Sequence, residues 1–226
     1  MRRGLISTEN WIASLPARVQ AAIAECCVEE RYAAGEDIRS AGSIPDGIIH
    51  VASGYVRLHA LQEDGRQLLI TIYAAGNCYA ETAVVGKRPL HHTTTALTDT
   101  VIRRLPVDAF WTLYGLHPEI PEALCRKFAN ALSWQIAARE MRASKRLAQC
   151  IALLLQHASE ICGTRYVDGI EITCPFTQQD LADHLDVTRQ SIQREVRELK
   201  RAGLVERNGR RWLIRDGKDL QSFCAA

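Results

Sequence analysis

The spacing of apolar residues changes along this chain of 226 residues and divides it into regions of different structure. From Glu9 to Cys27 apolar positions recur at helical spacing. From Arg31 to about Leu105 short apolar runs alternate with glycine-containing turns, which is typical of an antiparallel sandwich or barrel. After His117 the helical period returns. The pattern predicts an α+β fold in which an antiparallel, jelly-roll-like β-roll of about eight strands precedes a helical C-terminal half.

A long helix is expected over about residues 117–142. Its apolar stripe is longer than the length of helix that would cover the β-roll. The helix therefore suits a two-stranded coiled coil between subunits. The alternative is a helix that folds back on its own domain. The expected dimer contacts are Leu124, Phe128, Ala131 and Leu132. A hinge at 143–145 then separates a sensor domain, residues 1–142, from a second domain, residues 143–226.

Two short amphipathic helices are predicted between Phe176 and Gly203. Thr177 and Thr188 are candidate N-caps, because a threonine hydroxyl can accept a hydrogen bond from a free backbone N–H. The first helix has an apolar face around Leu181, and the second buries a stripe that consists of Ile192, Val196 and Leu199. This pattern indicates a helix-turn-helix, whose second helix enters the major groove of DNA.

A β-hairpin wing is expected after the second helix, because Asn208-Gly209 favours a tight turn between strand-like flanks. From Thr188 to Arg215 there are nine basic and three acidic residues, a net charge of +6 in a chain of net charge +2. Such a basic patch suits DNA phosphates, although a protein-interaction module with a solvated basic face is the alternative. The expected DNA contacts are Thr177, Gln178, Thr188, Arg189, Gln190, Gln193, Arg194, Arg197, Arg210 and Arg211.

Composition places limits on the other classes of function. The chain is 47% apolar and 24% charged, as in soluble globular proteins, and no apolar run approaches the ~20 residues of a membrane span. The eight cysteines have no regular spacing and no export signal precedes them, which favours reduced thiols in a cytoplasm. We find no motif of a nucleotide hydrolase, serine hydrolase or zinc protease, so neither an enzyme nor a catalytic or metal site is expected.

The roll glycines, the cassette GNCYAE at Gly76–Glu81 and the run TRQSIQR at Thr188–Arg194 resemble the Crp/Fnr superfamily of bacterial transcription regulators. The resemblance covers essentially the whole chain and implies a winged helix-turn-helix at its C-terminal end. It also implies a homodimer that binds palindromic double-stranded DNA, contacts RNA polymerase and is switched by an effector held in the roll against the long helix. The effector residues expected from it are Ala80, Glu81, Thr94, Thr95 and Gln135.

Departures from the family pattern bear on the effector. Cyclic-nucleotide binders carry an arginine that pairs with the phosphate, whereas Thr94-Thr95-Ala96 stands at that place here. Burial of an unpaired anion is costly, so an unknown neutral or cationic effector is expected in place of cyclic AMP. A cyclic-nucleotide-gated regulator remains an alternative, as do thiol-based redox sensing and haem held by Cys78 or His91-His92. An iron–sulfur cluster is not expected, because adjacent Cys26-Cys27 cannot supply the ligand spacing, and no resident cofactor is predicted.

Overall fold

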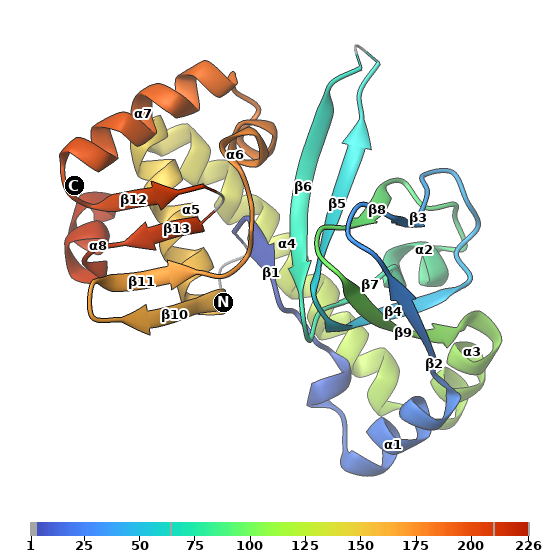
Figure 1. Cartoon of the computed structure of the whole chain (residues 1–226). Coiled ribbons are helices and arrows are strands. Elements are labelled where there is room, and N and C mark those ends of the chain that lie inside the picture. The colour runs from blue at the N-terminus through green and yellow to red at the C-terminus, as the bar shows by residue number, and fades with distance from the viewer. Residues whose placement is uncertain (1–3, 64, 210, 226) are drawn as a thin grey trace. The chain divides into compact units, whose positions relative to one another are not determined.

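The computed structural model describes residues 4–63, 65–209 and 211–225, except for the side chains of residues 141, 142, 208 and 225. The described residues form two compact units (Figure 1). One unit holds residues 7–60 and 72–133, and the other holds the remaining described residues. None of the described helices is long and apolar enough to cross a membrane.

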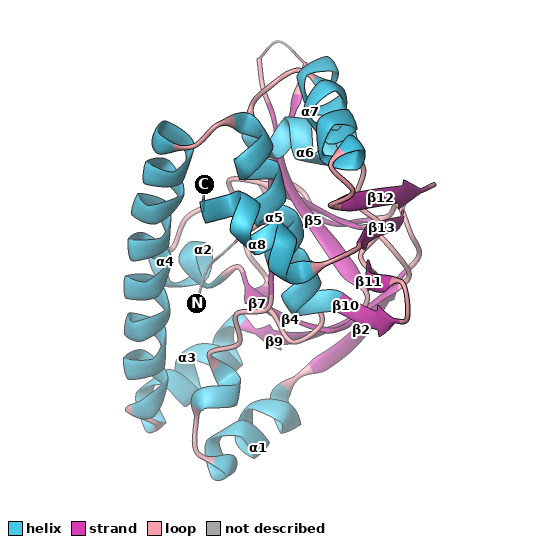
Figure 2. Ribbon diagram, turned by 90° about the vertical axis from the view of Figure 1, so that its left-hand side faces the viewer, coloured by secondary structure: helices cyan, strands magenta, loops and turns pink. Residues whose placement is uncertain are grey.

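The N-terminal half contains the β-roll and the helices beside it. Its elements are β1 (Ile6–Ser7), a 3₁₀ turn at Ile12–Ser14, α1 (Ala17–Cys26), β2 (Val28–Tyr32), β3 (Asp37–Arg39), β4 (Gly47–Ser53), β5 (Tyr55–Leu61), β6 (Gln67–Ala74), β7 (Cys78–Tyr79), α2 (Glu81–Gly86), β8 (Thr93–Ala96), β9 (Thr100–Pro106), α3 (Val107–Leu116) and α4 (Glu119–Ser144). Figure 2 shows α4 as one continuous helix.

The roll consists of two sheets, with strand orders β1-β6-β5-β8-β3 and β2-β9-β4-β7. Side chains from both sheets meet in one core, which includes Ile38, Val51, Val56 and Ile102. Glycine is required at the β4–β5 turn, because Gly54 has a φ of +86° and a Cβ there would lie 2.5 Å from the Asp99 carbonyl oxygen. The predicted antiparallel roll is confirmed: β2 to β9 are the eight strands of the expected region, and β1 from the N-terminal segment adds a ninth.

A second core lies where α1, α3 and the first turns of α4 pack together. Ile23, Phe110, Ile120 and Leu124 are each at most 2% exposed and belong to one cluster of buried residues. Leu124 was expected at a dimer seam, but the structure places it inside its own unit. The half-buried Phe128 packs against the same cluster. The first part of α4 therefore folds back on the roll, which was the alternative interpretation of the sequence.

The C-terminal half contains α5 (Leu147–Cys162), β10 (Gly163–Tyr166), β11 (Gly169–Ile172), α6 (Gln178–Leu185), α7 (Arg189–Arg201), β12 (Val205–Asn208), β13 (Arg211–Ile214) and α8 (Gly217–Ala225). Its four strands form a sheet with the order β10-β11-β13-β12. The buried Trp212 anchors this sheet, since its Nε1 donates to the Phe176 carbonyl oxygen at 3.1 Å and its ring stacks on that of Phe176. The predicted helix-turn-helix and wing are confirmed.

Two boundaries differ from the expected ones. α4 continues to Ser144 and α5 begins at Leu147, so the break between them falls later than the expected hinge. In the wing, Asn208 pairs with Arg211 and is a strand residue, not the first residue of the turn. The register is set by Trp212, which must face the core, because a slip of one residue would turn it to the other side of the sheet.

Candidate DNA-binding surface and effector cavity

Both expected helix caps are confirmed in the helix-turn-helix. The Thr177 hydroxyl accepts from the Asp180 backbone N–H at 3.1 Å, and the Asp180 carboxylate accepts in return from the Thr177 N–H at 2.6 Å. The Thr188 hydroxyl accepts from the Ser191 N–H at 3.1 Å. These bonds satisfy backbone donors that have no partner inside the helix, and they fix where α7 begins.

The expected DNA-contacting residues gather on one side of α7 because its apolar stripe faces inward. Ile192, Val196 and Leu199 are at most 1% exposed, so the residues between them face solvent. The exposed ones are Thr188, Arg189, Gln190, Arg194 and Arg197, and Gln193 is half-buried. Gln178 is the first residue of α6 and is half-buried. Arg210 lies outside the described residues.

The arginines of this surface differ in how they are paired. Arg194 contacts the neighbouring Glu195 at 2.9 Å, and Arg211 on the wing contacts Glu171 of β11 at the same distance. Arg189 and Arg197 make no ion pair with any described residue. The positive charge of the first turns of α7 is therefore less neutralised than that of the wing.

Arg207 lies on β12 of the wing and was not among the expected DNA contacts. Its guanidinium lies over the Trp212 ring, 5.2 Å from the centroid. Burial, then the nearby charge of Arg189, lowers the pKa of Arg207, and its buried Nε has no hydrogen-bond partner among the described residues. Arg207 lies opposite the inward-facing Trp212 across the hairpin, so the hairpin register could have identified it. The two close cations, Arg189 and Arg207, suit a phosphate group.

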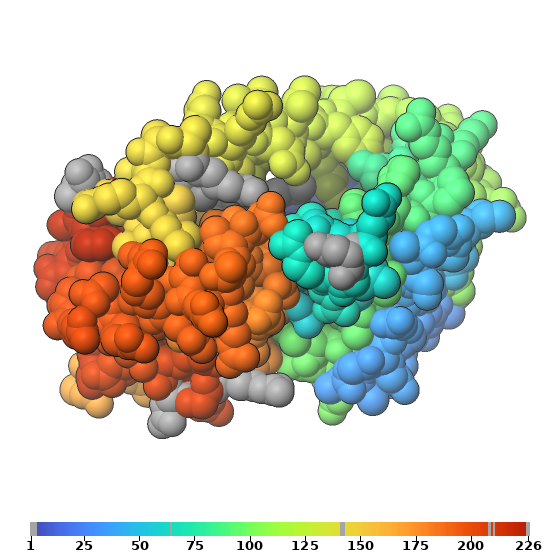
Figure 3. Space-filling view, turned by 90° about the horizontal axis from the view of Figure 1, so that it is seen from above, coloured from blue at the N-terminus to red at the C-terminus, as the bar shows by residue number. Residues whose placement is uncertain are grey.

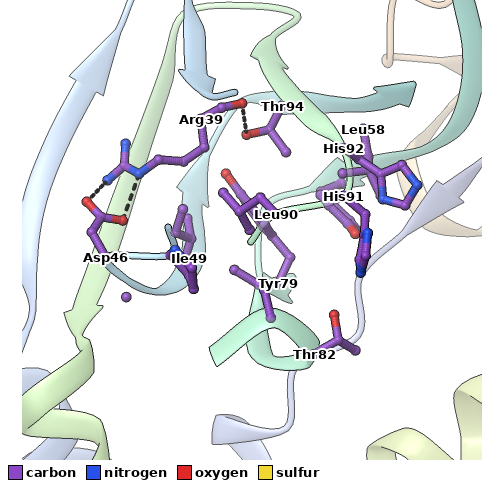
Figure 4. A pocket seen from close by; sticks show the side chains of 15 residues that line it. Arg39, Asp46, Ile49, Leu58, Tyr79, Thr82, Leu90, His91, His92 and Thr94 are labelled. Carbon is purple, nitrogen blue, oxygen red and sulfur yellow. Dashed lines mark hydrogen bonds and ion pairs between the residues drawn. The ribbon is translucent and has the colours of Figure 1, made fainter. Parts of the chain in front are cut away.

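The roll contains a cavity of about 110 Å³ (Figure 4). It lies between β3 to β7, α2 and the segment before β8, and its polar lining includes Arg39, Asp46, Thr82, His91, His92 and Thr94. Of the five expected effector residues, Ala80 and Thr94 line this cavity, whereas Glu81, Thr95 and Gln135 are not among its lining residues. Arg39, Asp46 and Thr82 were not among the residues expected at the effector site.

Glu81 is buried and is held by the protein itself. Its Oε1 accepts from the Trp11 indole N–H at 2.8 Å and lies 2.7 Å from the Lys127 ammonium of α4. Lys127, which is 8% exposed, also donates to the Cys78 carbonyl oxygen at 2.7 Å. The sequence left open whether Glu81 serves a ligand or the local turn, and this geometry gives it a structural role between α2, α4 and the N-terminal segment.

Thr95 and Gln135 lie elsewhere. The Thr95 hydroxyl donates to the Asp37 carboxylate at 2.6 Å and lies 2.9 Å from the Nε2 of His59, on the face of β8 opposite to Thr94. This follows from the two-residue repeat of a strand, which places neighbouring side chains on opposite faces. Gln135 is an exposed residue of α4.

Arg39 lines the cavity, yet all five of its N–H groups are used. Asp46 accepts two of them in a bidentate contact with both oxygens at 2.8 Å, and Glu30 accepts a third at 3.2 Å. The Tyr32 hydroxyl and the Ile38 carbonyl oxygen accept the other two. A guanidinium carries five donors, so Arg39 has none left for a ligand.

Burial shifts the pKa of two further polar groups at the cavity, His92 and Tyr79. Burial, together with neighbouring imidazoles, lowers the pKa of His92. Burial raises the pKa of Tyr79, which therefore stays a phenol. The His91 and His92 rings lie at one side of the cavity with their centroids 6.2 Å apart. Among the described residues, no group of three or more His, Cys, Asp or Glu could hold a metal ion.

All eight cysteines are free thiols in the structure. Burial raises the pKa of Cys27, Cys78 and Cys174, so each remains a weakly reactive thiol at neutral pH. Cys125, on α4, is exposed.

One side of α4 carries an exposed apolar stripe. Leu132 is 66% exposed and Ile136 is 55% exposed, and with the exposed Cys125 and Ala129 they are spaced four, three and four residues apart. This is the a/d spacing of a heptad. In the space-filling view the outer side of α4, coloured yellow to yellow-green, is uncovered (Figure 3). Leu132, an expected dimer residue, belongs to this stripe, and Ala131 is half-buried beside it.

Two protein-family models match the chain. The model of the Crp-like helix-turn-helix domain matches residues 145–223, and that of the cyclic nucleotide-binding domain matches residues 29–116. The chain is 23% identical over 217 residues to the transcriptional activator protein FnrL of Cereibacter sphaeroides, covering 88% of this chain and 85% of the relative. It is 23% identical over 194 residues to the CRP-like cAMP-activated global transcriptional regulator of Mycobacterium tuberculosis, covering 82% and 83%.

Solved structures share the fold over nearly the whole chain. A CooA mutant from Carboxydothermus hydrogenoformans superimposes with a TM-score of 0.74 at 19% identity and covers 98% of both chains. FixK2 from Bradyrhizobium japonicum gives a TM-score of 0.76 at 19% identity and covers 88% of this chain and 98% of its own. The two matched domains, the order of elements and these relatives agree, and the chain belongs to the Crp/Fnr superfamily of transcription regulators, which are not enzymes.

Proposed function

We propose that this protein is a sequence-specific regulator that binds palindromic DNA as a homodimer and responds to an effector held in its β-roll. The observation that carries the DNA-binding part is the surface of α7. Its apolar stripe is buried, and Arg189, Gln190, Arg194 and Arg197 project from the opposite side. Arginine can contact guanine and glutamine can contact adenine through paired hydrogen bonds, so this helix carries the groups needed to distinguish bases.

The proposed dimer forms through α4, along the stripe of Cys125, Ala129, Leu132 and Ile136. The a/d spacing lets two such helices pack knobs into holes, which would cover side chains that one chain leaves in water. A two-fold dimer presents two copies of α7, and its DNA site is then a palindrome whose half-sites are about one helical turn apart. The relative FnrL is a transcriptional activator by its name, which makes RNA polymerase the expected protein partner of this chain.

Effector control is proposed to pass from the cavity to α4 through α2. Ala80, Thr82 and Ala83 line the cavity. Glu81, which lies between Ala80 and Thr82 in the sequence, forms a buried ion pair with Lys127 of α4. A ligand that shifts this turn would also shift the buried ion pair and with it α4. The ligand changes DNA affinity only by as much as it prefers one arrangement over the other.

Cyclic AMP is a poorer candidate for this cavity. About 110 Å³ is well below the ~300–1,000 Å³ of typical sites for larger ligands, and Arg39 has no donor left for a phosphate. The M. tuberculosis relative is cAMP-activated by its name, so cyclic AMP is the ligand to test on this chain. Calorimetry of the full chain should give no heat of binding with cyclic AMP at physiological concentration. Tight binding that also raises DNA affinity would return this protein to the nucleotide-gated branch.

Selection of DNA from a random library by the purified full chain tests the function itself. The expected result is a palindromic consensus, and a gel shift at moderate salt should then show tight binding that falls as salt rises. Arg189→Ala should lose about 1–3 kcal/mol of binding at that site. A matched control is Arg201→Ala, since Arg201 lies on the same helix but pairs with Glu198 at its last turn. Failure to enrich any sequence would refute the proposal.

A further inference from the structure

The cavity of the roll contains a cation that is already fully neutralised. Arg39 is 15% exposed at its side chain and forms a bidentate ion pair with Asp46 and a third contact with Glu30. Arg104 contacts the same two carboxylates, Glu30 at 2.6 Å and Asp46 at 3.4 Å. Two guanidinium and two carboxylate groups leave this cluster with no net charge.

Asp46 occupies the position on Arg39 that an anionic ligand would take. Its two oxygens lie at 2.8 Å from Nε and Nη2 of Arg39, the fork-to-fork geometry with which a guanidinium binds a carboxylate or phosphate (Figure 4). Asp46 is on the loop before β4 and its side chain is 48% exposed, whereas Arg39 is largely buried. An anion entering the cavity would therefore find Arg39 already paired, and the more exposed partner of that pair, Asp46, is negative.

The other walls suit a small uncharged molecule. Ile49, Leu58 and Leu90 supply apolar surface, and Thr82 and Thr94 supply hydroxyl groups. The volume of about 110 Å³ is slightly less than the ~150 Å³ of an engineered cavity that holds benzene, so the space takes no more than about one six-membered ring.

We propose that the effector cavity selects an uncharged ligand of about one ring carrying a hydrogen-bonding group, and that Asp46 sets this selectivity by standing in for an anion on Arg39. The inference rests on the proposed function, in which this cavity is the effector site. It makes Asp46 the specificity-determining residue of the cavity, and it predicts that one substitution changes the charge of the accepted ligand.

Benzamide and benzoate test the proposal, because they have nearly the same shape and differ in charge. Saturation-transfer NMR on the full chain should show binding of benzamide and none of benzoate. In Asp46→Asn two donors of Arg39 lose their carboxylate, so benzoate affinity should rise at least about tenfold while benzamide affinity changes little. Asp37→Asn, which removes an acid of β3 that does not line the cavity, should leave benzoate unbound.

Two controls test where benzamide binds and whether each variant is folded. Thr82→Phe places a ring at an exposed lining position and should abolish benzamide binding. Circular dichroism checks that each variant is folded, and if Asp46→Asn is not, the comparison of benzamide with benzoate on the wild type still decides. The proposal is overturned if benzoate binds the wild type as well as benzamide does, if benzamide does not bind, or if folded Asp46→Asn gains no benzoate affinity. If any of these results is found while DNA binding is intact, only the proposal on the ligand fails and the proposed regulator function is retained.

Discussion

Replacement of Lys127 by methionine tests whether the buried ion pair fixes α4 to the roll. Lys127 and Glu81 have side chains only 7% and 3% exposed, and their charged atoms are 2.7 Å apart. Methionine fills a similar volume but leaves the Glu81 carboxylate buried, with the Trp11 N–H as its remaining donor. Breaking a buried pair by removing one partner costs about 3–5 kcal/mol, so the free energy of unfolding should fall by about that amount.

A double-mutant cycle separates the pair from the burial of each group. Glu81→Gln with Lys127→Met removes both charges, keeps an acceptor for Trp11 and should restore most of the lost stability, giving a coupling energy of at least about 2 kcal/mol. Arg126→Met is the matched control, since Arg126 is the preceding residue of α4 and makes only an exposed pair with Glu122, for which less than about 1 kcal/mol is expected. Urea unfolding followed by circular dichroism measures the wild type, both single variants, the double variant and the Arg126→Met control. A loss below about 1 kcal/mol in Lys127→Met, or a double variant as unstable as the sum of both single ones, would refute the reasoning.

The remaining predictions concern assembly, DNA binding and pH. Leu132→Glu should give a folded monomer in sedimentation velocity, because it places charge on the exposed stripe; a dimeric Leu132→Glu protein would contradict the proposed seam. Leu124→Glu should instead destabilise the core formed by α1, α3 and the first turns of α4. In DNA titrations Arg194→Ala should lose about 1–3 kcal/mol at the preferred site only, whereas Arg211→Ala on the wing should weaken all sequences and reduce the salt slope by about one unit. Burial lowers the pKa of His50 from its ordinary value near 6.5, so the unfolded state binds more protons than the folded state just below that pH. The free energy of unfolding measured in urea should therefore fall as pH drops from about 7 to 5.5. His50→Gln should reduce this dependence on pH.

Much of the fold could be predicted because the sequence carries its local causes. The stripe of Ile192, Val196 and Leu199 specifies α7 and the face that it buries. Thr177 and Thr188 specify where α6 and α7 begin, because each hydroxyl accepts from the N–H group three residues further on. The basic residues between the apolar positions then face solvent by geometry alone. For the same reason most of the expected DNA contacts lie together on one surface.

The long helix shows where local pattern was insufficient. Apolar residues on α4 form two stripes, and the sequence does not say which of them the roll will cover. The tertiary structure decides this, because Leu124 completes the cluster around Phe110 and thereby turns Leu132 and Ile136 outward. The helix was predictable, whereas the side available to a partner was not.

The effector cavity depends on contacts between distant residues and was the least predictable part. Glu81 stands in a cassette where a ligand contact was plausible, but its partner Lys127 is 46 positions away and takes that carboxylate for the protein itself. Arg39 was not noticed because an isolated arginine on a short strand carries no motif, and its role arises only when β2 and the loop before β4 bring Glu30 and Asp46 to it. The sequence determined which helices and strands form and which face of α7 is basic, since these follow from periods of two and 3.6 residues within one segment. Only the tertiary structure decided which charges neutralise each other, because that depends on which segments far apart in the chain fold together.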